Sequence, residues 1–381
     1  MKFDSIYDFL KHIFPYNRSL TGKGNVKTLK EIKKIIPLLK IKKIKSGTKV
    51  FDWKIPKEWN VNEAYIKDSK GKKIIDYKNN NLHLISYSSP FKKRLKLKNL
   101  LKIIYTLPKQ PKAIPYITSY YEKKYGFCMS DNQKKKLKNE YYDINIDTNF
   151  KNGSLSYGEL FLKGRVKKEV IFSSNICHPS MANNELSGPC VMTFLAKWIS
   201  KQKSRHYSYR FIFVPETIGS IQYIANNLKN LKKNIICGFT LNCLGDNNNY
   251  SYVPSRNGDT FSDYILKKAL KKHTNKFKIF RWKDRGSDER QYCSPGVDLP
   301  FCNISRTKYG EFKEYHTSLD DLNFVSKAGL NGSFSLLKKM FKLIEKSRLP
   351  QSKFLCEPML GKRNLYKTNQ KINGYYENKK K

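Results

Sequence analysis

The sequence has few acidic residues, no Cys-x-x-Cys pair and no long apolar run. None of its apolar runs reaches the roughly 18 residues that a membrane-spanning helix needs, so we expect no transmembrane segment. The eight cysteines stand singly, several of them inside apolar stretches, and no signal-peptide pattern precedes them. These absences predict buried free thiols and a soluble protein of the reducing cytoplasm.

The shortage of acidic residues leaves a large positive charge. The chain has 75 Lys and Arg against 31 Asp and Glu, for a net charge of +44. The lysines are spread along nearly the whole chain, without an Arg-rich stripe or a recognisable nucleic-acid module. We therefore expect no specific nucleic-acid partner, although an acidic partner such as an anionic glycan or a membrane surface would be attracted. Nucleic-acid binding, the alternative, would weaken steeply with salt.

The chain does contain ample material for a hydrophobic core. Hydrophobic residues make up 39% and aromatic residues 13%, which excludes a disordered protein. A chain of 381 residues can form two or three modest domains, or one large domain with an insertion. The sequence also leaves open a homo-oligomer.

The first part of the chain shows two different patterns. Residues 4–14 and 28–36 place apolar side chains on one helical face, which predicts two helices. From residue 46 to about 155, short strand-like runs such as 82–87 are separated by turn signals. This second pattern predicts a mostly β module, which we interpret as a lid or a packing unit.

From residue 156 the chain alternates between strand-like and helical stretches. The alternation predicts a central, largely parallel sheet with helices on both faces. Ligands of such sheets bind at the carboxyl ends of the strands, so the chemistry should collect in the loops that follow them. The expected strands are 169–176, 209–214, 235–243, 277–282 and 299–304, and the expected helices are 189–199, 220–231, 260–272 and 325–344.

The loops after these strands are rich in candidate ligands. Two of the six histidines and several carboxylates occur there in dense polar sequences, which is a mixed nitrogen and oxygen set suited to Zn²⁺. A catalytic zinc needs about three protein ligands and a carboxylate nearby that accepts a proton. Glu216, the only acidic residue of its loop, could be that base or a ligand. The candidates are His178, Asn184, Glu185, Glu216, Asp246, Asp288, Glu289, Arg290 and His316.

Long sequence words in a fixed order run through nearly the whole chain. They include residues 18–22, 51–53, 56–59, 82–83, 119–121, 126–128, 177–180, 215–220, 286–292 and 314–318. In these words the chain resembles the aminopeptidase-like proteins that are related to the M28 zinc peptidases. Such proteins often occur among bacterial surface-polysaccharide biosynthesis genes.

The resemblance implies a phosphorylase/hydrolase-like α/β fold of the aminopeptidase type. A mixed, largely parallel sheet would be flanked by helices, with the mostly β module inserted into it. The implied regions are N-terminal helices at 1–45 that pack on the catalytic domain, the inserted module at 46–155, a zinc aminopeptidase-like domain at 156–350 and a basic tail at 351–381. We expect no C-terminal winged-helix domain, which related proteins often carry.

Carried over residue by residue, the resemblance assigns roles to three side chains. His178 matches the first zinc ligand, His316 matches the last one, and Glu216 matches one of an adjacent pair of glutamates. Asn184 and Asn242 stand where the family has Asp. Because a neutral Asn is a poor substitute for a bridging carboxylate, we expect one zinc ion rather than two.

A nearby carboxylate would complete the ligands of this ion. Asp246, Asp288 and Glu185 are the candidates, and we assign Asp246. Asn184, Glu185, Asp288, Glu289 and Arg290 are further metal or substrate contacts.

Two functions follow from the resemblance. The first is a zinc hydrolase that cleaves a peptide-like or amino-sugar amide, with Glu216 as the base and Arg290 near the developing oxyanion. Arg290 could instead form a structural ion pair with Asp288. The second function is a catalytically inactive, aminopeptidase-derived binding or scaffold protein in glycan assembly. We favour the hydrolase.

Overall fold

The computed structural model describes residues 3–348, 355–363 and 365. The chain divides into two units, Met1–Glu345 and Lys346–Lys381. The described part of the second unit contains one turn of 3-10 helix, Gly361–Arg363. The sheets and all candidate site residues belong to the first unit.

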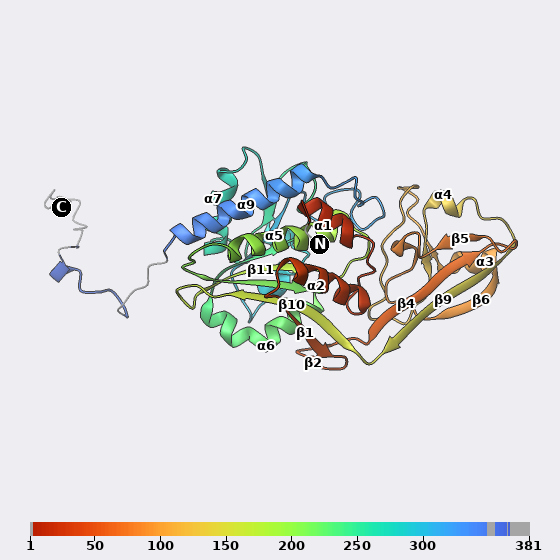
Figure 1. Ribbon diagram of the computed structural model, residues 1–381, viewed down its shortest axis with the longest axis horizontal. Coiled ribbons are helices and arrows are strands. Elements are labelled where there is room, and N and C mark those ends of the chain that lie inside the picture. Colours follow the sequence, from red (N-terminus) through yellow and green to blue (C-terminus); the bar gives the residue numbers. More distant parts are fainter. Residues whose placement is uncertain (1–2, 349–354, 364, 366–381) are drawn as a thin grey trace. The chain divides into compact units, whose positions relative to one another are not determined.

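The first unit is built on an eight-stranded mixed sheet (Figure 1). In the order in which they pair, its strands are β1 (Lys40–Lys45), β10 (Ser154–Leu162), β12 (Ser208–Val214), β11 (Glu169–Asn175), β13 (Ile235–Leu241), β16 (Phe301–Ser305), β14 (Ser251–Val253) and β15 (Lys278–Ile279). From β12 to β16 the pairs are parallel, whereas the pairs β1–β10, β10–β12 and β14–β16 are antiparallel. The predicted mixed, largely parallel sheet is confirmed.

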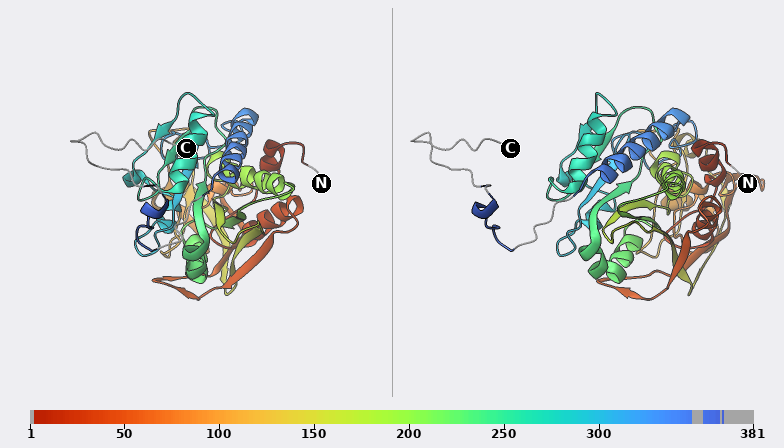
Figure 2. Two further views of the ribbon diagram at one scale, coloured as in Figure 1. Left: turned by 90° about the vertical axis from the view of Figure 1, so that its left-hand side faces the viewer. Right: turned by 60° about the vertical axis from the view of Figure 1, so that its left-hand side comes forward.

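Helices cover both faces of this sheet (Figure 1, Figure 2). Phe172 of β11 enters the core on one face and Ile171 the core on the other, because successive strand side chains point to opposite faces. The first core contains α1 (Ile6–Ile13), α2 (Lys23–Ile35), α5 (Gly188–Ser200), α7 (Phe261–Lys271) and α9 (Lys327–Lys346), and the second contains α6 (Ile218–Asn234) and α8 (Glu289–Tyr292). Within the described residues, no helix has the length and apolarity to cross a membrane.

The junction between β11 and α5 carries the candidate site. β11 is buried along its whole length, as expected for a strand covered on both faces. The chain then turns into α5 at Gly188, where a Cβ atom would lie 2.3 Å from the Leu241 carbonyl oxygen of β13. Only glycine permits this approach. The connection therefore lies tightly against the ends of the parallel strands; it consists of a loop, 176–181, and a π-helical turn, Ala182–Ser187, that leads into α5.

Residues 46–153 form mostly β structure, beside the central sheet (Figure 1). A four-stranded antiparallel sheet has the order β5-β4-β9-β6, and β9 continues through the Asn152–Gly153 turn into β10 of the central sheet. The elements are β2 (Lys49–Val50), β3 (Trp53–Lys54), β4 (Glu58–Lys67), β5 (Lys73–Asp76), β6 (Phe91–Lys96), α3 (Leu97–Leu100), β7 (Ile104–Tyr105), β8 (Phe127–Cys128), α4 (Asp131–Lys134) and β9 (Tyr141–Lys151).

Some local predictions are wrong. The run 82–87 is not a strand: Asn81–His83 is a 3-10 turn, stabilised because the Asn80 side chain accepts a hydrogen bond from the Leu82 amide. The second helix begins at Lys23 rather than at residue 28, directly after Gly22 with its φ of 101°. A helix cap and a left-handed glycine, rather than apolar spacing, set these two boundaries.

Two strands bear on the predicted division of the chain into regions. β1, at the end of the expected region 1–45, forms the edge of the central sheet, and β10 runs across the expected boundary at 155/156. The four regions themselves stay a prediction. All eight cysteines lie in the described residues, where none is in a disulfide and only Cys356 is exposed, in line with free thiols.

Candidate functional site

The candidate residues meet at the carboxyl ends of the parallel strands. His178 follows β11, Glu216 follows β12, and His316 lies in the loop between β16 and α9. Non-glycine residues in a left-handed backbone conformation are strained, and they cluster at functional sites. Four such residues occur in the loops that follow β11, β12, β13 and β16: Ser180 (φ 43°), Thr217 (63°), Cys243 (50°) and His316 (55°).

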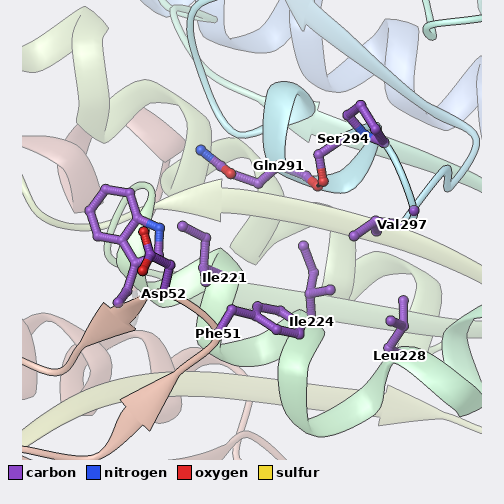
Figure 3. Close-up of a pocket in the computed structure, with 11 residues that line it drawn as sticks. Phe51, Asp52, Ile221, Ile224, Leu228, Gln291, Ser294 and Val297 are labelled. Atoms are coloured by element: carbon purple, nitrogen blue, oxygen red, sulfur yellow. Dashed lines mark hydrogen bonds between the residues drawn. The ribbon is translucent and has the colours of Figure 1, made fainter.

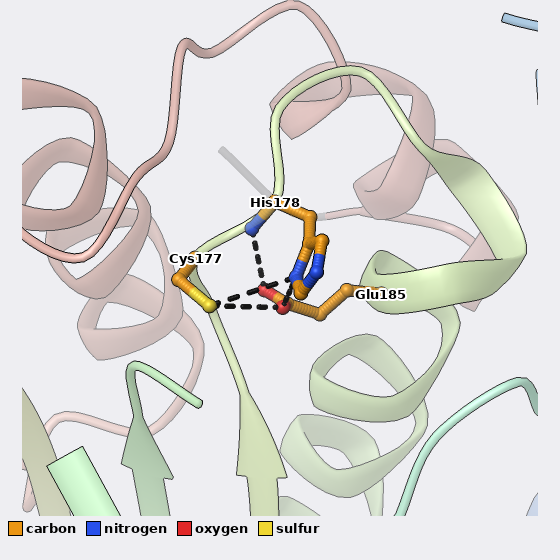
Figure 4. A group of neighbouring side chains, drawn as sticks. All are labelled: Cys177, His178 and Glu185. Atoms are coloured by element: carbon orange, nitrogen blue, oxygen red, sulfur yellow. Dashed lines mark hydrogen bonds and ion pairs between the residues drawn. The ribbon is translucent and has the colours of Figure 1, made fainter. Parts of the chain in front are cut away.

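The His178 ring is fixed in place by Glu185 (Figure 4). Its Nδ1 is hydrogen-bonded to the Glu185 carboxylate, and the His178 amide donates to the same carboxylate at 3.1 Å. Burial alone would lower the pKa of His178, but the charge and the hydrogen bond of Glu185 outweigh burial and raise it. A carboxylate on one ring nitrogen is how proteins orient a metal-binding histidine. The other nitrogen, Nε2, lies 3.8 Å from Glu216 Oε2.

Cys177 completes a buried cluster with these two residues (Figure 4). Its Sγ lies 3.4 Å from Glu185 Oε2 and accepts a hydrogen bond from the Glu216 amide at 3.2 Å. The possible ligand atoms of Cys177, His178 and Glu185 lie within 4.8 Å of one another. Burial, followed by the charges of Glu185 and Glu216, raises the pKa of Cys177 and keeps the thiol protonated. The sequence indicated only a buried thiol at this position.

The Glu216 carboxylate lies between the His178 ring and the polar segment before α8. Its Oε1 accepts a hydrogen bond from Ser287 Oγ at 3.0 Å, and the side chain remains 25% exposed. Burial raises the pKa of Glu216, with His178 opposing this rise and Glu185 adding to it. A carboxylate with a raised pKa beside an imidazole is suited to proton transfer near neutral pH.

The His316 ring lies beside the His178 ring, and one of its nitrogens has no hydrogen-bond partner among the described residues. Its ring lies 5.2 Å from that of His178 and stacks on Tyr315 at 3.9 Å between centroids. Burial and the neighbouring His178 lower the pKa of His316 to about 3, so the ring is neutral. Its Nε2 is buried without a hydrogen-bond partner among the described residues. Such an orphaned nitrogen fits a metal ligand.

The three side chains open onto a cavity of about 290 Å³. Tyr116 packs against both histidines, with ring centroids 5.1 Å from His178 and 5.2 Å from His316, and its amide donates to the His316 carbonyl oxygen at 2.9 Å. Sequence reasoning missed these aromatic residues, although several lie in the words shared with the aminopeptidase-like proteins. The lining residues are Leu20, Trp53, Tyr116, Thr118, Tyr120, Tyr121, Cys177, His178, Glu216, Thr217, Arg290 and His316.

Asp246, the third expected ligand, is directed to neighbouring loops and not into this cavity. Its carboxylate accepts hydrogen bonds from the amide and the hydroxyl of Thr307 at 3.0 and 2.8 Å, from Asn183 Nδ2 at 3.1 Å and from the Asn248 amide at 3.0 Å. Asn184 is buried nearby, and its amide donates to Asp320 Oδ2 at 2.8 Å. Neither residue lines the cavity.

Asp288 and Glu289 are buried behind the cavity, whereas Arg290 lines it. Asp288 accepts hydrogen bonds from the Thr217 amide at 2.8 Å and from Ser220 Oγ at 2.6 Å, and burial, then the charge of Glu216, raises its pKa to about 8. Glu289 accepts from the Gly286 amide at 2.9 Å. Arg290 donates to Thr217 Oγ1 at 2.8 Å. The two carboxyls thus brace the loops that carry Glu216 and Arg290.

Residues 7–347 match a protein family described as a domain of unknown function, DUF4910. The chain belongs to this family. A Clostridium acetobutylicum protein named for polysaccharide biosynthesis and an aminopeptidase-like domain is 43% identical over 367 residues, which cover 95% of this chain and 83% of that protein. The resemblance to aminopeptidase-like proteins is confirmed.

Two solved structures are similar to this chain. A crystal structure of a Clostridium acetobutylicum protein named as a peptidase superposes with a TM-score of 0.88 at 43% identity, covering 94% of this chain and 84% of that one. A zinc aminopeptidase from Bacillus subtilis superposes with a TM-score of 0.64 at 14% identity, covering 90% and 96%. At that identity the likeness shows the fold alone, and it confirms the aminopeptidase fold.

Proposed function

We propose that this protein is an amide hydrolase that uses one zinc ion held by His178 and His316. The observation that carries the proposal is the Nε2 of His316, which is buried beside the His178 ring and has no hydrogen-bond partner in the described part of the chain. Imidazole nitrogens with a carboxylate close by are a donor set that Zn²⁺ accepts. The hydrogen bond that His178 Nδ1 donates to Glu185 supports the same proposal, because it leaves Nε2 as the nitrogen that faces Glu216.

In this proposal Glu216 is the general base. A bound zinc ion would activate water and polarise the scissile carbonyl. Glu216 takes a proton from the attacking water and delivers it to the leaving amine, and its raised pKa suits both halves of that transfer. Arg290, at the cavity wall, contributes positive charge near the developing oxyanion.

The proposed substrate is a peptide-like or amino-sugar amide in polysaccharide biosynthesis. The name of the Clostridium acetobutylicum relative supports the pathway, and the aminopeptidase fold supports the amide bond. The eight free cysteines support a cytoplasmic location.

Metal analysis of the purified protein tests the zinc site. We expect about one zinc per chain in the wild type and a loss of zinc in His178→Ala and His316→Ala, because each substitution removes an imidazole ligand. His273→Ala, which changes a histidine outside the cavity, is the control and should retain zinc. A wild-type protein that takes up no zinc after reconstitution would contradict the hydrolase and favour an aminopeptidase-derived binding protein.

The role of Glu216 has a separate test. Glu216→Gln keeps the size of the side chain but cannot accept the proton, so hydrolysis should fall by about 10²- to 10⁴-fold with zinc retained. Turnover is measured on a panel of aminoacyl anilides and N-acetylated amino sugars. If Glu216→Gln loses zinc instead, Glu216 is a ligand and not the base.

A further inference from the structure

Figure 3 shows an apolar groove of about 390 Å³, which shares Trp53 with the candidate cavity. The tip of the β2–β3 hairpin forms one wall, and the segment after α8 forms another. Phe51, at the hairpin tip, is 61% exposed. The groove is lined by Phe51, Asp52, Trp53, Ile221, Ile224, Leu228, Gln291, Ser294, Pro295, Gly296 and Val297.

The groove and the cavity are neighbours along the same elements. Trp53 lines both of them. On α8, Arg290 faces the cavity while the next residue, Gln291, faces the groove. The helix α6 starts directly after Glu216 and Thr217, so the groove continues from the proposed base along this helix.

One face of α6 forms the floor of the groove. Ile221, Ile224 and Leu228 have the spacing of residues on one helical face. From Thr217 to Leu228 this face extends for about 16 Å at the rise of an α-helix. A group that enters the groove from the cavity therefore meets an elongated apolar surface.

Few of the side chains that line the groove are polar, namely Asp52, Gln291 and Ser294. Asp52 and Gln291 lie toward one side of the groove, while Leu228 and Val297 lie at the other (Figure 3). Ser294 Oγ already donates to the Gln291 carbonyl oxygen at 2.9 Å. A bound peptide would bring two polar backbone groups per residue that need partners, whereas a hydrocarbon chain brings none.

We propose that this groove binds an aliphatic chain of the amide substrate. The scissile amide would lie in the cavity beside Glu216, and the hydrocarbon would run past Trp53 along α6. This assignment rests on the proposed function, because it treats the groove as part of the substrate site. It narrows the substrate to an amide that carries an extended aliphatic group.

Calorimetric titration of the full-length protein with acetylglycine, hexanoylglycine and decanoylglycine tests the groove. Each of these probes carries an amide and a carboxylate, and they differ only in chain length. Affinity should rise about fourfold per added methylene until the groove is full. N-acetyl-trileucine, an apolar peptide, should bind more weakly than decanoylglycine. A series without chain-length dependence, or equal binding of the peptide, would overturn the proposal.

Two substitutions locate the effect. Phe51→Asn suits the φ of 54° at this hairpin turn, and Leu228→Gln keeps a residue that favours helix. Each should weaken decanoylglycine binding by about tenfold while leaving acetylglycine binding nearly unchanged. Leu38→Gln, at a side chain that is 68% exposed and outside the groove, is the matched control. Equal losses in the control would overturn the proposal.

Binding is measured without turnover, so failure of the groove and failure of the hydrolase are distinguishable. If the wild type takes up no zinc but its affinity still rises with chain length, the missing zinc overturns the hydrolase and the rising affinity supports the groove. A zinc-loaded active protein with a flat series would overturn the groove alone.

Discussion

Two loops at the same edge of the sheet use their polar side chains in opposite ways. After β13, the Asp246 carboxylate accepts hydrogen bonds from Asn183 and Thr307 in neighbouring loops and from Asn248 in its own loop. After β11, His178 has one nitrogen held by Glu185 and turns the other toward Glu216. Asp246 therefore behaves as a brace between loops, whereas His178 is positioned for a ligand.

The difference lies in which polar atoms are left without partners. A buried polar atom without a hydrogen bond costs about 1–3 kcal/mol, so a fold keeps one only where something else compensates for it. Among the residues that the structure describes, Nε2 of His316 is such an atom, and its ring lies beside the His178 ring. The cavity side of the sheet edge therefore carries an imidazole nitrogen without a partner among the described residues, whereas both oxygens of the Asp246 carboxylate are hydrogen-bonded.

We expect the largest effect on stability from a substitution of Arg18, because this side chain is hydrogen-bonded to the loop that carries His178. The side chain is fully buried, and its Nε donates to the His178 carbonyl oxygen at 2.9 Å while Nη1 donates to the Ile13 carbonyl oxygen at 2.7 Å. Burial lowers its pKa to about 10, with Glu185 opposing this shift. Arg18→Met should lower the free energy of unfolding by about 2–6 kcal/mol, since it leaves the buried carbonyl oxygens of His178 and Ile13 without donors, at about 1–3 kcal/mol each.

Urea denaturation followed by circular dichroism measures this loss. Arg281→Met, at an exposed arginine paired with Asp284, is the control and should cause no measurable change. A small loss in Arg18→Met would mean that the loop holds His178 without the buried cation.

Asp246→Asn tests the other loop of the comparison, and we expect a smaller loss of stability from it. The substitution places an amide group where two donors of Thr307 now point, so unfolding should become easier by about 1–3 kcal/mol. Zinc content should stay at the wild-type level, unlike in His178→Ala. Loss of zinc with unchanged stability would instead make Asp246 the third ligand, as the sequence predicted.

Much of the central domain could be predicted from local sequence. The expected strand 169–176 differs from β11 by one residue at its end, and the expected helix 189–199 differs from α5 by one residue at each end. Apolar spacing suffices there because both elements are buried in one continuous core. The loops that carry His178 and Glu216 follow directly from these elements, so local patterns also located two of the three central side chains.

The rest of the site depends on contacts between distant parts of the chain. Tyr116 and Trp53 reach the cavity from the mostly β region, and spacing within that region gives no sign of this. Asp246 and His178 likewise have the same sequence signature, a polar residue after an apolar strand. Only the positions of Thr307 and Glu185 distinguish a brace from a ligand.

We expect the smallest change in stability from a substitution of His316, which tests specifically whether this side chain has a partner in the folded protein. Its pKa of about 3 in the folded protein lies below the value of about 6.5 expected in the unfolded chain, so the unfolded state binds more protons between these values. The resulting stability is present above about pH 6.5 and is lost as the pH falls toward 3. In zinc-free protein, the wild type should therefore lose more stability between pH 7 and pH 4.5 than His316→Gln. Parallel losses in guanidinium titrations would mean that His316 is already partnered, and the cavity side would then resemble the Asp246 side.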